Sequence, residues 1–433
     1  MILAVDFGST FTKVTAVSDT KIVGTAKAFT TIQTDIRDGL DIALMELHRQ
    51  TGPLEYSHRF AASSAGGGLK MVALGLVPAL TAKAASMAAC NAGAKVVKTF
   101  SYELSDAEAQ EIYDINPDLI LLSGGTDGGN KEVILHNAKI LANIGRDFCV
   151  IIAGNKSAAS DAAKILGKNA VVCGNVMPEF NKLDILPAKD AIRTIFMEKI
   201  VEAKGLGEIA KTFSAPIIPT PLAVFEGAQL LSESLGSILV VDVGGATTDV
   251  YSMCDGTPTI PNVVQKGLPE PFAKRSVEGD LGMRYSMDAL VEGDKDLETY
   301  QVKCIANPSY IPPPHSSDVM LDEKIAGIAV DIAVERHSGR LEQFFTPYGE
   351  SFCQIGKDLT KIKYVIGLGG SIIYSKNSQN ILSNAIQNKN DFLKPTNPRF
   401  LIDKEYIFSA MGLLSRYKKS LALKILKKEM MEV

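Results

Sequence analysis

The chain has 433 residues, a length that predicts about two to four structural units rather than one core. Hydrophobic residues make up 46% and charged residues 22%, so a sizeable core is available and global disorder is not expected. The 45 basic and 49 acidic residues give a net charge of −4, unlike the strongly basic surface of a typical nucleic-acid-binding protein.

The cysteine spacing and the N-terminal sequence indicate the cellular compartment in which the protein is expected. The six cysteines are scattered without a closely spaced pair, which argues against a zinc ribbon, an iron–sulfur cluster and a disulfide framework. No basic segment precedes the first apolar run, 2–5, and no apolar run reaches the roughly 20 residues that span a membrane. We therefore expect a cytoplasmic protein with reduced thiols and with neither a membrane nor a nucleic acid as partner.

Short apolar runs alternate with helical stretches along the chain, which predicts an α/β fold with largely parallel strands. We expect strands at 2–6, 12–17, 59–63, 95–99, 119–123, 148–153, 170–173, 238–243, 248–253 and 363–367. We expect helices at 38–50, 80–93, 105–115, 132–144, 157–166, 188–203, 221–234, 321–336, 376–389 and 407–428.

Differences in the sequence pattern divide the chain into four segments. Residues 1–60 have the pattern of a hairpin followed by a helix, and 61–180 repeat the βα units of a Rossmann-like domain. Residues 181–236 lead through further helices, and 237–433 restart with a strand and glycine turn like those at the N-terminus. Within this last segment we expect a loop-rich cap at about 255–360 and a basic helix at the C-terminus.

Three glycine-rich turns contain the candidate site residues. The first has Asp6, Gly8, Ser9, Thr10, Thr12 and Lys13; the second has Asp242, Gly244, Gly245, Thr247 and Thr248; the third has Gly369, Gly370 and Ser371. Glycine lets the backbone bend tightly and approach a ligand, and hydroxyl and N–H groups in such a turn can hold phosphate oxygens. The first two turns repeat one pattern, which suggests two similar half-domains that face one ligand. A carboxylate at each strand end can hold Mg²⁺ and orient an attacking water.

Together, and in this order, the three turns resemble those of the actin/Hsp70/sugar-kinase superfamily. Two later segments, Pro219–Ala228 and Ser409–Leu414, are similar to its two hinge helices. The resemblance implies duplicated actin-like ATPase halves of ribonuclease-H-like fold, with ATP and Mg²⁺ between them. It implies that Asp6 and Asp242 are the catalytic and metal-binding residues, that the other residues of the first two turns bind phosphate, and that the third turn faces adenosine.

One position departs from the pattern of this superfamily. Thr220 stands just before Pro221, where many members carry an acidic residue. This departure leaves fast hydrolysis, and phosphate transfer to a sugar, without support. Whether ATP is slowly hydrolysed or only sensed therefore stays open.

Further segments resemble one branch of the superfamily. They include Ala62–Lys70, Leu121–Gly129, Ser276–Gly282 and Glu335–Gly339. The set is similar to the accessory (MutL-type) protein family of glutamate (methylaspartate) mutase and related cobalamin aminomutases, over nearly the whole chain. The resemblance implies an ATP-binding, chaperone-like reactivating factor for an adenosylcobalamin-dependent mutase. The mutase subunits would be its protein partner, and closure of the cleft would let damaged cofactor leave.

The segment 90–155 resembles the Rossmann-type cobalamin domain of such mutases. The cobalt-ligating Asp-x-His-x-x-Gly motif is absent, and His136 does not stand in such a frame. We therefore expect no cobalamin ligation by this chain. Two roles for the segment remain open: it competes for a surface of the mutase, or it is only a scaffold.

Other functions remain compatible with the sequence. These are a small-molecule kinase of the same superfamily, an actin-like filament protein, and an ATPase activator of radical dehydratases, although the last requires a close cysteine pair. The sequence leaves open whether the protein forms a homo-oligomer. The basic segment 416–428 is compatible with a docked terminal helix or with contact to an acidic partner.

Overall fold

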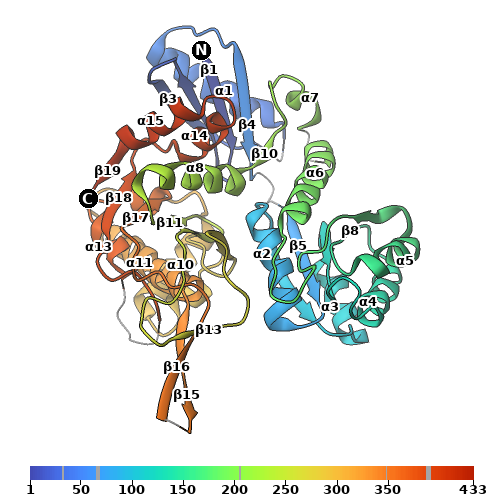
Figure 1. The fold of residues 1–433 in the computed structure, drawn as a ribbon. Helices are drawn as coiled ribbons and strands as arrows, with labels where there is room; N and C mark the ends of the chain where they lie inside the picture. Colours follow the sequence, from blue (N-terminus) through green and yellow to red (C-terminus); the bar gives the residue numbers. More distant parts are fainter. Residues whose placement is uncertain (32–33, 65–68, 204–205, 348, 387–391) are drawn as a thin grey trace.

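The structure is a computed structural model that describes residues 1–31, 34–64, 69–203, 206–347, 349–386 and 392–433. Figure 1 shows two sheets joined by helices α8 and α14, with a third α/β body beside them. The predicted α/β class is confirmed. Part of the segment Ala62–Lys70, namely 65–68, lies outside the described residues.

The first sheet has the strand order β10-β4-β1-β2-β3. Its members are β1 (Ile2–Phe7), β2 (Phe11–Val17), β3 (Ile22–Phe29), β4 (His58–Ser63) and β10 (Ile218–Pro219). Strands β1, β2 and β3 pair antiparallel, whereas β4 pairs parallel with β1 and β10 pairs parallel with β4. Every residue of β1 is buried, as expected for a central strand covered on both faces. Helix α1 (Ile36–Thr51) connects β3 to β4 and packs on the sheet through Leu40, Ala43 and Leu47, which share one helical face.

The second sheet repeats this topology in the order β14-β12-β11-β17-β18-β19. Its members are β11 (Ile238–Val243), β12 (Thr248–Met253), β14 (Ala273–Glu278), β17 (Tyr364–Leu368), β18 (Arg399–Asp403) and β19 (Met430–Glu432). Strands β11, β12 and β14 pair antiparallel, and β17 and β18 continue parallel to β11. Apart from the terminal strand β19, both sheets follow one scheme of three antiparallel and two added parallel strands. The chain therefore contains the duplicated actin-like halves that its two similar turns predict.

The segment predicted as a loop-rich cap contains more regular structure than expected. It holds β13 (Val264–Lys266), β14, α9 (Asp288–Val291), α10 (Lys295–Ala306), α11 (Ser317–His337), β15 (Arg340–Thr346) and β16 (Gly349–Ile355). Strand β14 is the third strand of the second sheet, although its sequence has three charged residues in six. Strands β13, β16 and β15 form a small sheet that projects from the second half (Figure 1). Helices α12 (Gly370–Ile373) and α13 (Ser378–Ser383) follow β17, and the end of the helix predicted at 376–389 lies outside the described residues.

The inserted domain is an all-parallel sheet in the order β6-β5-β7-β8-β9. Its strands are β5 (Lys70–Gly75), β6 (Lys95–Ser101), β7 (Leu119–Leu122), β8 (Cys149–Ile152) and β9 (Ala170–Val172). Its helices are η2 (Pro78–Ala82), α2 (Lys83–Asn91), α3 (Asp106–Ile115), α4 (Glu132–Ala142), α5 (Lys156–Leu166) and η3 (Gly167–Asn169). Numbered from its own first strand the order is 2-1-3-4-5, a doubly wound Rossmann-like arrangement. The prediction of a Rossmann-like insert is confirmed, although its first strand β5 was not predicted.

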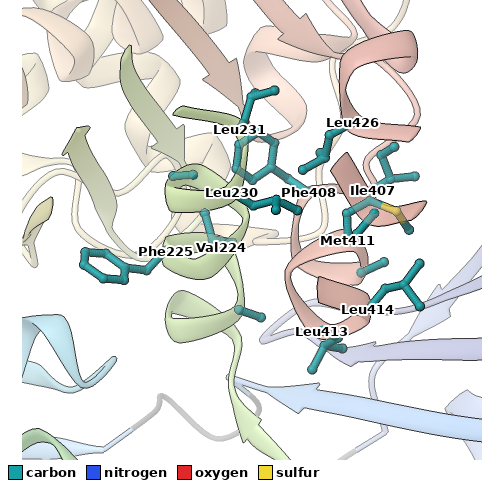
Figure 2. Packing of buried hydrophobic residues seen from close by; sticks show 14 of the residues in the cluster. Val224, Phe225, Leu230, Leu231, Ile407, Phe408, Met411, Leu413, Leu414 and Leu426 are labelled. Carbon is teal, nitrogen blue, oxygen red and sulfur yellow. The ribbon is translucent and has the colours of Figure 1, made fainter. Parts of the chain in front are cut away.

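The remaining helices connect the three bodies. They are α6 (Leu186–Ala203), α7 (Gly207–Ala210), α8 (Thr220–Leu235), α14 (Phe408–Ser415) and α15 (Lys419–Glu429). Figure 2 shows α8 and α14 packed against each other through a shared apolar cluster. A Cβ atom added at Gly412 would lie 1.8 Å from the carbonyl oxygen of Ala223, so this crossing requires glycine.

The basic C-terminal segment docks on its own chain. Lys418 pairs with Asp19 at 2.6 Å and Lys419 with Glu233 at 2.7 Å, while Arg416 pairs with Glu226. The segment predicted as one helix is divided into α14 and α15. Among the described residues, no helix has both the length and the apolar character of a membrane span.

Candidate functional site

A cavity of about 870 Å³ lies between the two halves, next to α8 and α14. Most of the predicted site residues line it: Asp6, Gly8, Ser9, Thr10, Lys13, Asp242, Gly244, Gly245, Thr247, Gly369, Gly370 and Ser371. Thr12 and Thr248 do not, because both are fully buried within their strands. The Thr12 hydroxyl lies 3.1 Å from that of Thr30, and the Thr248 hydroxyl donates to the carbonyl of Leu281 at 2.6 Å.

The two aspartates occupy equivalent positions. Asp6 is the fifth residue of β1 and Asp242 the fifth of β11, each in a strand of six residues. Each strand pairs antiparallel with the strand that follows its turn and parallel with a later strand. The repeated topology therefore presents one carboxylate from each half to the same cavity.

The turns after the two aspartates close in the same way. The N–H of Gly8 donates to the carbonyl of Phe11 at 3.1 Å, and the N–H of Gly244 donates to the carbonyl of Thr247 at 2.9 Å. A Cβ at Gly8 would lie 2.6 Å from the Phe11 oxygen, so a larger residue would open this turn.

The third turn rests on the end of β11. Gly369 has φ +91°, and a Cβ there would lie 2.1 Å from the carbonyl oxygen of Val243. Glycine at this position therefore lets α12 begin in contact with the second turn.

The carboxylate of Asp6 is held by the two hinge helices. The Thr220 hydroxyl at the start of α8 donates to Asp6 Oδ1 at 2.6 Å, and the Ser409 hydroxyl in α14 donates to Oδ2 at 3.1 Å. Thr220 is the residue that replaces the acidic residue common in the superfamily. A hydroxyl here orients Asp6, whereas a second carboxylate would repel it.

Asp242 lies in a site rich in carboxylates. Burial raises its pKa to about 7, with further contributions from Asp249, Asp6 and Asp403, while Lys13 opposes the shift. Burial also raises the pKa of Asp403 to about 6, although that carboxylate accepts backbone N–H bonds at the start of α14. Among the described residues, none donates a hydrogen bond to the Asp242 carboxylate. Oxygen ligands with uncompensated negative charge suit a divalent cation such as Mg²⁺.

Two lysines of the first half contact tyrosines of the second. The Lys13 ammonium lies 3.4 Å from the ring centroid of Tyr406. Lys27 Nζ lies 4.7 Å from the ring centroid of Tyr374 and donates to its hydroxyl at 3.2 Å. Sequence reasoning predicted Lys13 but missed both tyrosines and Lys27, since no local motif contains them.

A buried arginine joins the second turn to the inserted domain. Arg275 Nη2 lies 2.5 Å from Asp249 Oδ1, and the two side chains are 2% and 11% exposed. Arg275 Nη1 also donates to the carbonyls of Cys90 at 2.7 Å and Ala94 at 3.0 Å. Asp249 itself accepts from the hydroxyl of Thr247 at 3.1 Å. Sequence reasoning missed Arg275, which belongs to the unpredicted strand β14.

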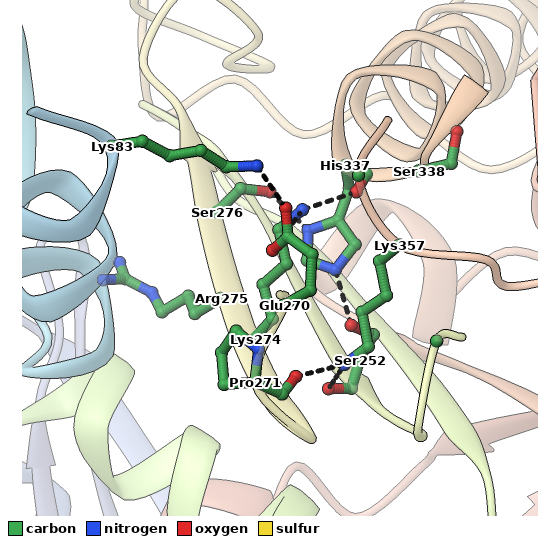
Figure 3. Close-up of polar contacts among 12 residues, drawn as sticks. Lys83, Ser252, Glu270, Pro271, Lys274, Arg275, Ser276, His337, Ser338 and Lys357 are labelled. Atoms are coloured by element: carbon green, nitrogen blue, oxygen red, sulfur yellow. Dashed lines mark hydrogen bonds and ion pairs between the residues drawn. The ribbon is translucent and has the colours of Figure 1, made fainter. Parts of the chain in front are cut away.

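Figure 3 shows a polar cluster near Arg275. Glu270 pairs with Lys83 of α2 at 2.6 Å and with Lys274 of β14 at 3.4 Å. Burial opposes its ionisation, but the two ammonium groups outweigh burial and hold the pKa of Glu270 below its usual value. The insert therefore docks on the second half through buried ionic contacts.

His337, in the same cluster, lies between the hydroxyls of Ser276 and Ser252, at 2.7 and 2.8 Å, and burial holds its pKa well below the usual value.

Comparison with known proteins identifies the family. The family model described as "MutL protein" matches residues 2–430. A protein from Clostridium tetanomorphum, Protein MutL, is 45% identical over 458 positions, covering 100% of this chain and 99% of that protein.

Solved structures show weaker similarity. Component A of (R)-2-hydroxyglutaryl-CoA dehydratase from Acidaminococcus fermentans is 10% identical with a TM-score of 0.31, over 99% of this chain and 98% of that chain. Xylulose kinase from Rhodospirillum rubrum is 10% identical with a TM-score of 0.36, over 100% of this chain and 93% of that chain. These scores are low, so the assignment rests on the family model and the curated relative. The chain belongs to the MutL protein family.

Proposed function

We propose that this protein is an ATP-binding accessory factor that reactivates an adenosylcobalamin-dependent mutase, either glutamate mutase or a related aminomutase. The observation that supports ATP binding most is that two half-domains of one topology present Asp6 and Asp242 to one cavity. The resemblance of the sequence to accessory proteins of glutamate mutase supports the partner.

The turns supply the groups that a magnesium nucleotide requires. The backbone N–H groups of the two hairpin turns, the hydroxyls of Ser9 and Thr10, and the Lys13 ammonium would hold phosphate oxygens. Asp6 and Asp242 would hold Mg²⁺, which when bound neutralises charge between carboxylates and phosphates. The third turn, at Gly369, would lie against adenosine.

The hydrogen bonds between Asp6 and the two hinge helices would couple ligand binding to the relative placement of the two halves. Thr220 and Ser409 connect this one carboxylate to both helices that join the halves. A ligand that changes the contacts of Asp6 biases the relative placement of the halves, to the extent that it binds one arrangement more tightly. To shift the ratio of the two arrangements from 1:99 to 99:1, the ligand must bind one of them more tightly by about 5.5 kcal/mol.

Hydrolysis would be slow in this site. Thr220 supplies a hydroxyl where many members of the superfamily have a second carboxylate. We therefore propose that ATP binding performs the conformational work and that slow hydrolysis resets it.

The inserted domain would recognise the mutase. Its strand order is that of a Rossmann-like domain, which supports the likeness to a cobalamin domain, yet its sequence lacks the motif that ligates cobalt. We propose that it competes for a mutase surface without binding cobalamin itself.

Reactivation of an inactivated mutase tests the proposal. Mutase carrying damaged cobalamin is incubated with this protein, ATP and Mg²⁺, and cobalamin release is followed by absorbance before fresh cofactor is added. We expect release and recovered activity with the wild type and with Asp41→Ala, whose side chain is exposed on α1 outside the cavity, but not with Asp242→Ala. Equal recovery without this protein, or with Asp242→Ala, would refute the proposal.

A further inference from the structure

The inserted domain contributes one cation to the cavity between the halves. Lys95, the first residue of β6, lines this cavity together with the residues of the three turns. A Cβ added at Gly279 would lie 2.8 Å from Lys95 Cε and 3.1 Å from Nζ, so the ammonium lies against the end of β14. Thr248 pairs with Glu278 across β12 and β14, so Gly279 stands beside Thr247 of the second turn.

Other cations that line the cavity already have partners. Arg275 pairs with Asp249 at 2.5 Å and Arg284 with Asp322 at 2.9 Å. Lys13 lies over the ring of Tyr406, and Lys27 lies near the ring of Tyr374 and donates to its hydroxyl. Among the residues that the structure describes, Lys95 forms no ion pair.

Glu278 and Asp280, on either side of Gly279, share one arginine as their ion-pair partner. Arg336 donates to Asp280 at 2.8 and 2.9 Å and to Glu278 at 2.9 Å. The hydrogen bond from Arg336 is the main cause that lowers the pKa of Asp280, and the charge of Lys95 contributes least. Because these carboxylates bind Arg336 and form no ion pair with Lys95, the Lys95 ammonium can bind an anion in the cavity.

The position of Lys95 is fixed from the second turn. Thr247 donates to Asp249, Asp249 pairs with Arg275, and Arg275 donates to the carbonyl of Ala94, the residue before Lys95. This buried chain of contacts connects a predicted phosphate-binding residue to the insert. A group that binds both Thr247 and Lys95 would therefore bridge the second half and the inserted domain.

We propose that Lys95 binds the terminal phosphates of the nucleotide and so couples the nucleotide state to the position of the inserted domain. This inference rests on the proposed function, because it deepens the assignment of the same cavity. The chemistry is a charge-assisted hydrogen bond from an ammonium to a phosphate oxygen, which favours a nucleoside triphosphate over a monophosphate.

Titration calorimetry with ATP and with AMP, each with Mg²⁺, tests Lys95→Met. Loss of one such bond corresponds to about a tenfold weaker Kd for ATP, with little change for AMP. Lys95→Arg should retain most of the ATP affinity. The matched control is Lys98→Met, on the same strand, whose ammonium pairs with Glu111 at 2.9 Å. The thermal midpoint without nucleotide should be unchanged in Lys95→Met, because no described ion pair is lost.

A second readout follows the insert itself. Hydrogen exchange in α2 and β6 should slow when ATP is added to the wild type, and this protection should be smaller in Lys95→Met. Lys95→Met that binds ATP like Lys98→Met overturns the inference, as does an equal loss of affinity for ATP and AMP, which indicates a structural role. Failure of the wild type to bind ATP refutes the proposed function, and this inference with it.

Discussion

Asp6 and Asp242 occupy equivalent strand positions, but the residues paired with them across each hairpin differ. Lys13 faces Asp6, whereas Asp249 faces Asp242. The first half therefore places a cation beside its aspartate, while the second half adds a carboxylate and neutralises it with Arg275. Burial is the main cause of the raised pKa of Asp242, and the carboxylate of Asp249 adds to it.

The raised pKa of Asp242 has a consequence for stability. The pKa rises from 3.8 to about 7 on folding, so the folded state binds the proton more tightly. This contribution to stability is fully present below pH 3.8 and is lost as the pH rises to about 7. Asp242→Asn should therefore flatten the decline in unfolding free energy between about pH 4 and 7, as measured by urea unfolding.

A bound divalent cation should favour the ionised form of Asp242. Binding of magnesium nucleotide near pH 6.5 should thus release a proton, which appears as a dependence of the calorimetric enthalpy on the ionisation enthalpy of the buffer. Asp242→Asn should remove this dependence, and exposed Asp161→Asn should leave it intact. A wild-type enthalpy that is the same in all buffers would contradict the assignment.

The residues that sequence reasoning found and missed differ in how local their contacts are. The turn residues were predictable because a strand, an aspartate and a glycine stand within a few positions of one another. Asp6 meets Thr220 and Ser409 across 214 and 403 positions, so no local pattern reveals these hydrogen bonds. Thr12 and Thr248 were predicted as ligands from their place next to the turns, but strand pairing buries both.

At the scale of elements, the crossing of α8 and α14 fixes how the two halves meet. Gly412→Ala would place a methyl group 1.8 Å from a backbone oxygen of α8, which cannot move without shifting that helix. We expect a loss of at least about 2 kcal/mol in unfolding free energy, measured in urea.

Gly327→Ala is the control for this substitution. It adds the same methyl group inside α11, where the nearest atom is the side-chain amide nitrogen of Asn384 at 2.9 Å. A side chain can move away and alanine favours the helix, so this variant should be much less affected. Equal stability of Gly412→Ala and the wild type would show that the helices do not cross as described.

The docking of α2 on β14 depends on Arg275. Arg275→Met leaves the carboxylate of Asp249 buried without its partner, which should reduce the unfolding free energy by about 3 kcal/mol. The carbonyls of Cys90 and Ala94 also lose a donor, so hydrogen exchange in α2 should accelerate. The exposed pair of Arg399 and Glu432 provides the control, since Arg399→Met should change stability by less than about 1 kcal/mol. Similar losses in both variants would contradict a buried ionic link.

Some secondary-structure elements could not be predicted from the sequence. Strand β14 lies in the segment predicted as a loop-rich cap, because that segment is rich in proline, glycine and acidic residues, yet Lys274 and Arg275 of this strand form buried ion pairs. The predicted helix 407–428 breaks between α14 and α15, where Lys418 has φ −130° and ψ 70°, outside the helical region, although no glycine or proline marks the break. The alternating βα pattern, by contrast, predicted the insert because its buried strands β7 and β8 are continuous apolar runs.

At the scale of the whole molecule, the cavity is where three bodies meet. Each half contributes an aspartate and a glycine turn, the hinge helices contribute Thr220 and Ser409, and the insert contributes Lys95. The duplication was predictable from the repeated turns. The docking of the insert at the rim of the cavity was not, because it depends on tertiary contacts between α2 and β14.

Calorimetric titration with ATP and Mg²⁺ of the wild type, Asp6→Ala and Asp242→Ala tests the central claim most directly. Asp161→Ala serves as the control for loss of one carboxylate. The account predicts one site per chain in the wild type and in Asp161→Ala, and at least about tenfold weaker binding in each of the other variants, because each loses a ligand of the metal–phosphate group. Undiminished binding in both Asp6→Ala and Asp242→Ala would contradict the claim that two matching halves hold one magnesium nucleotide between them.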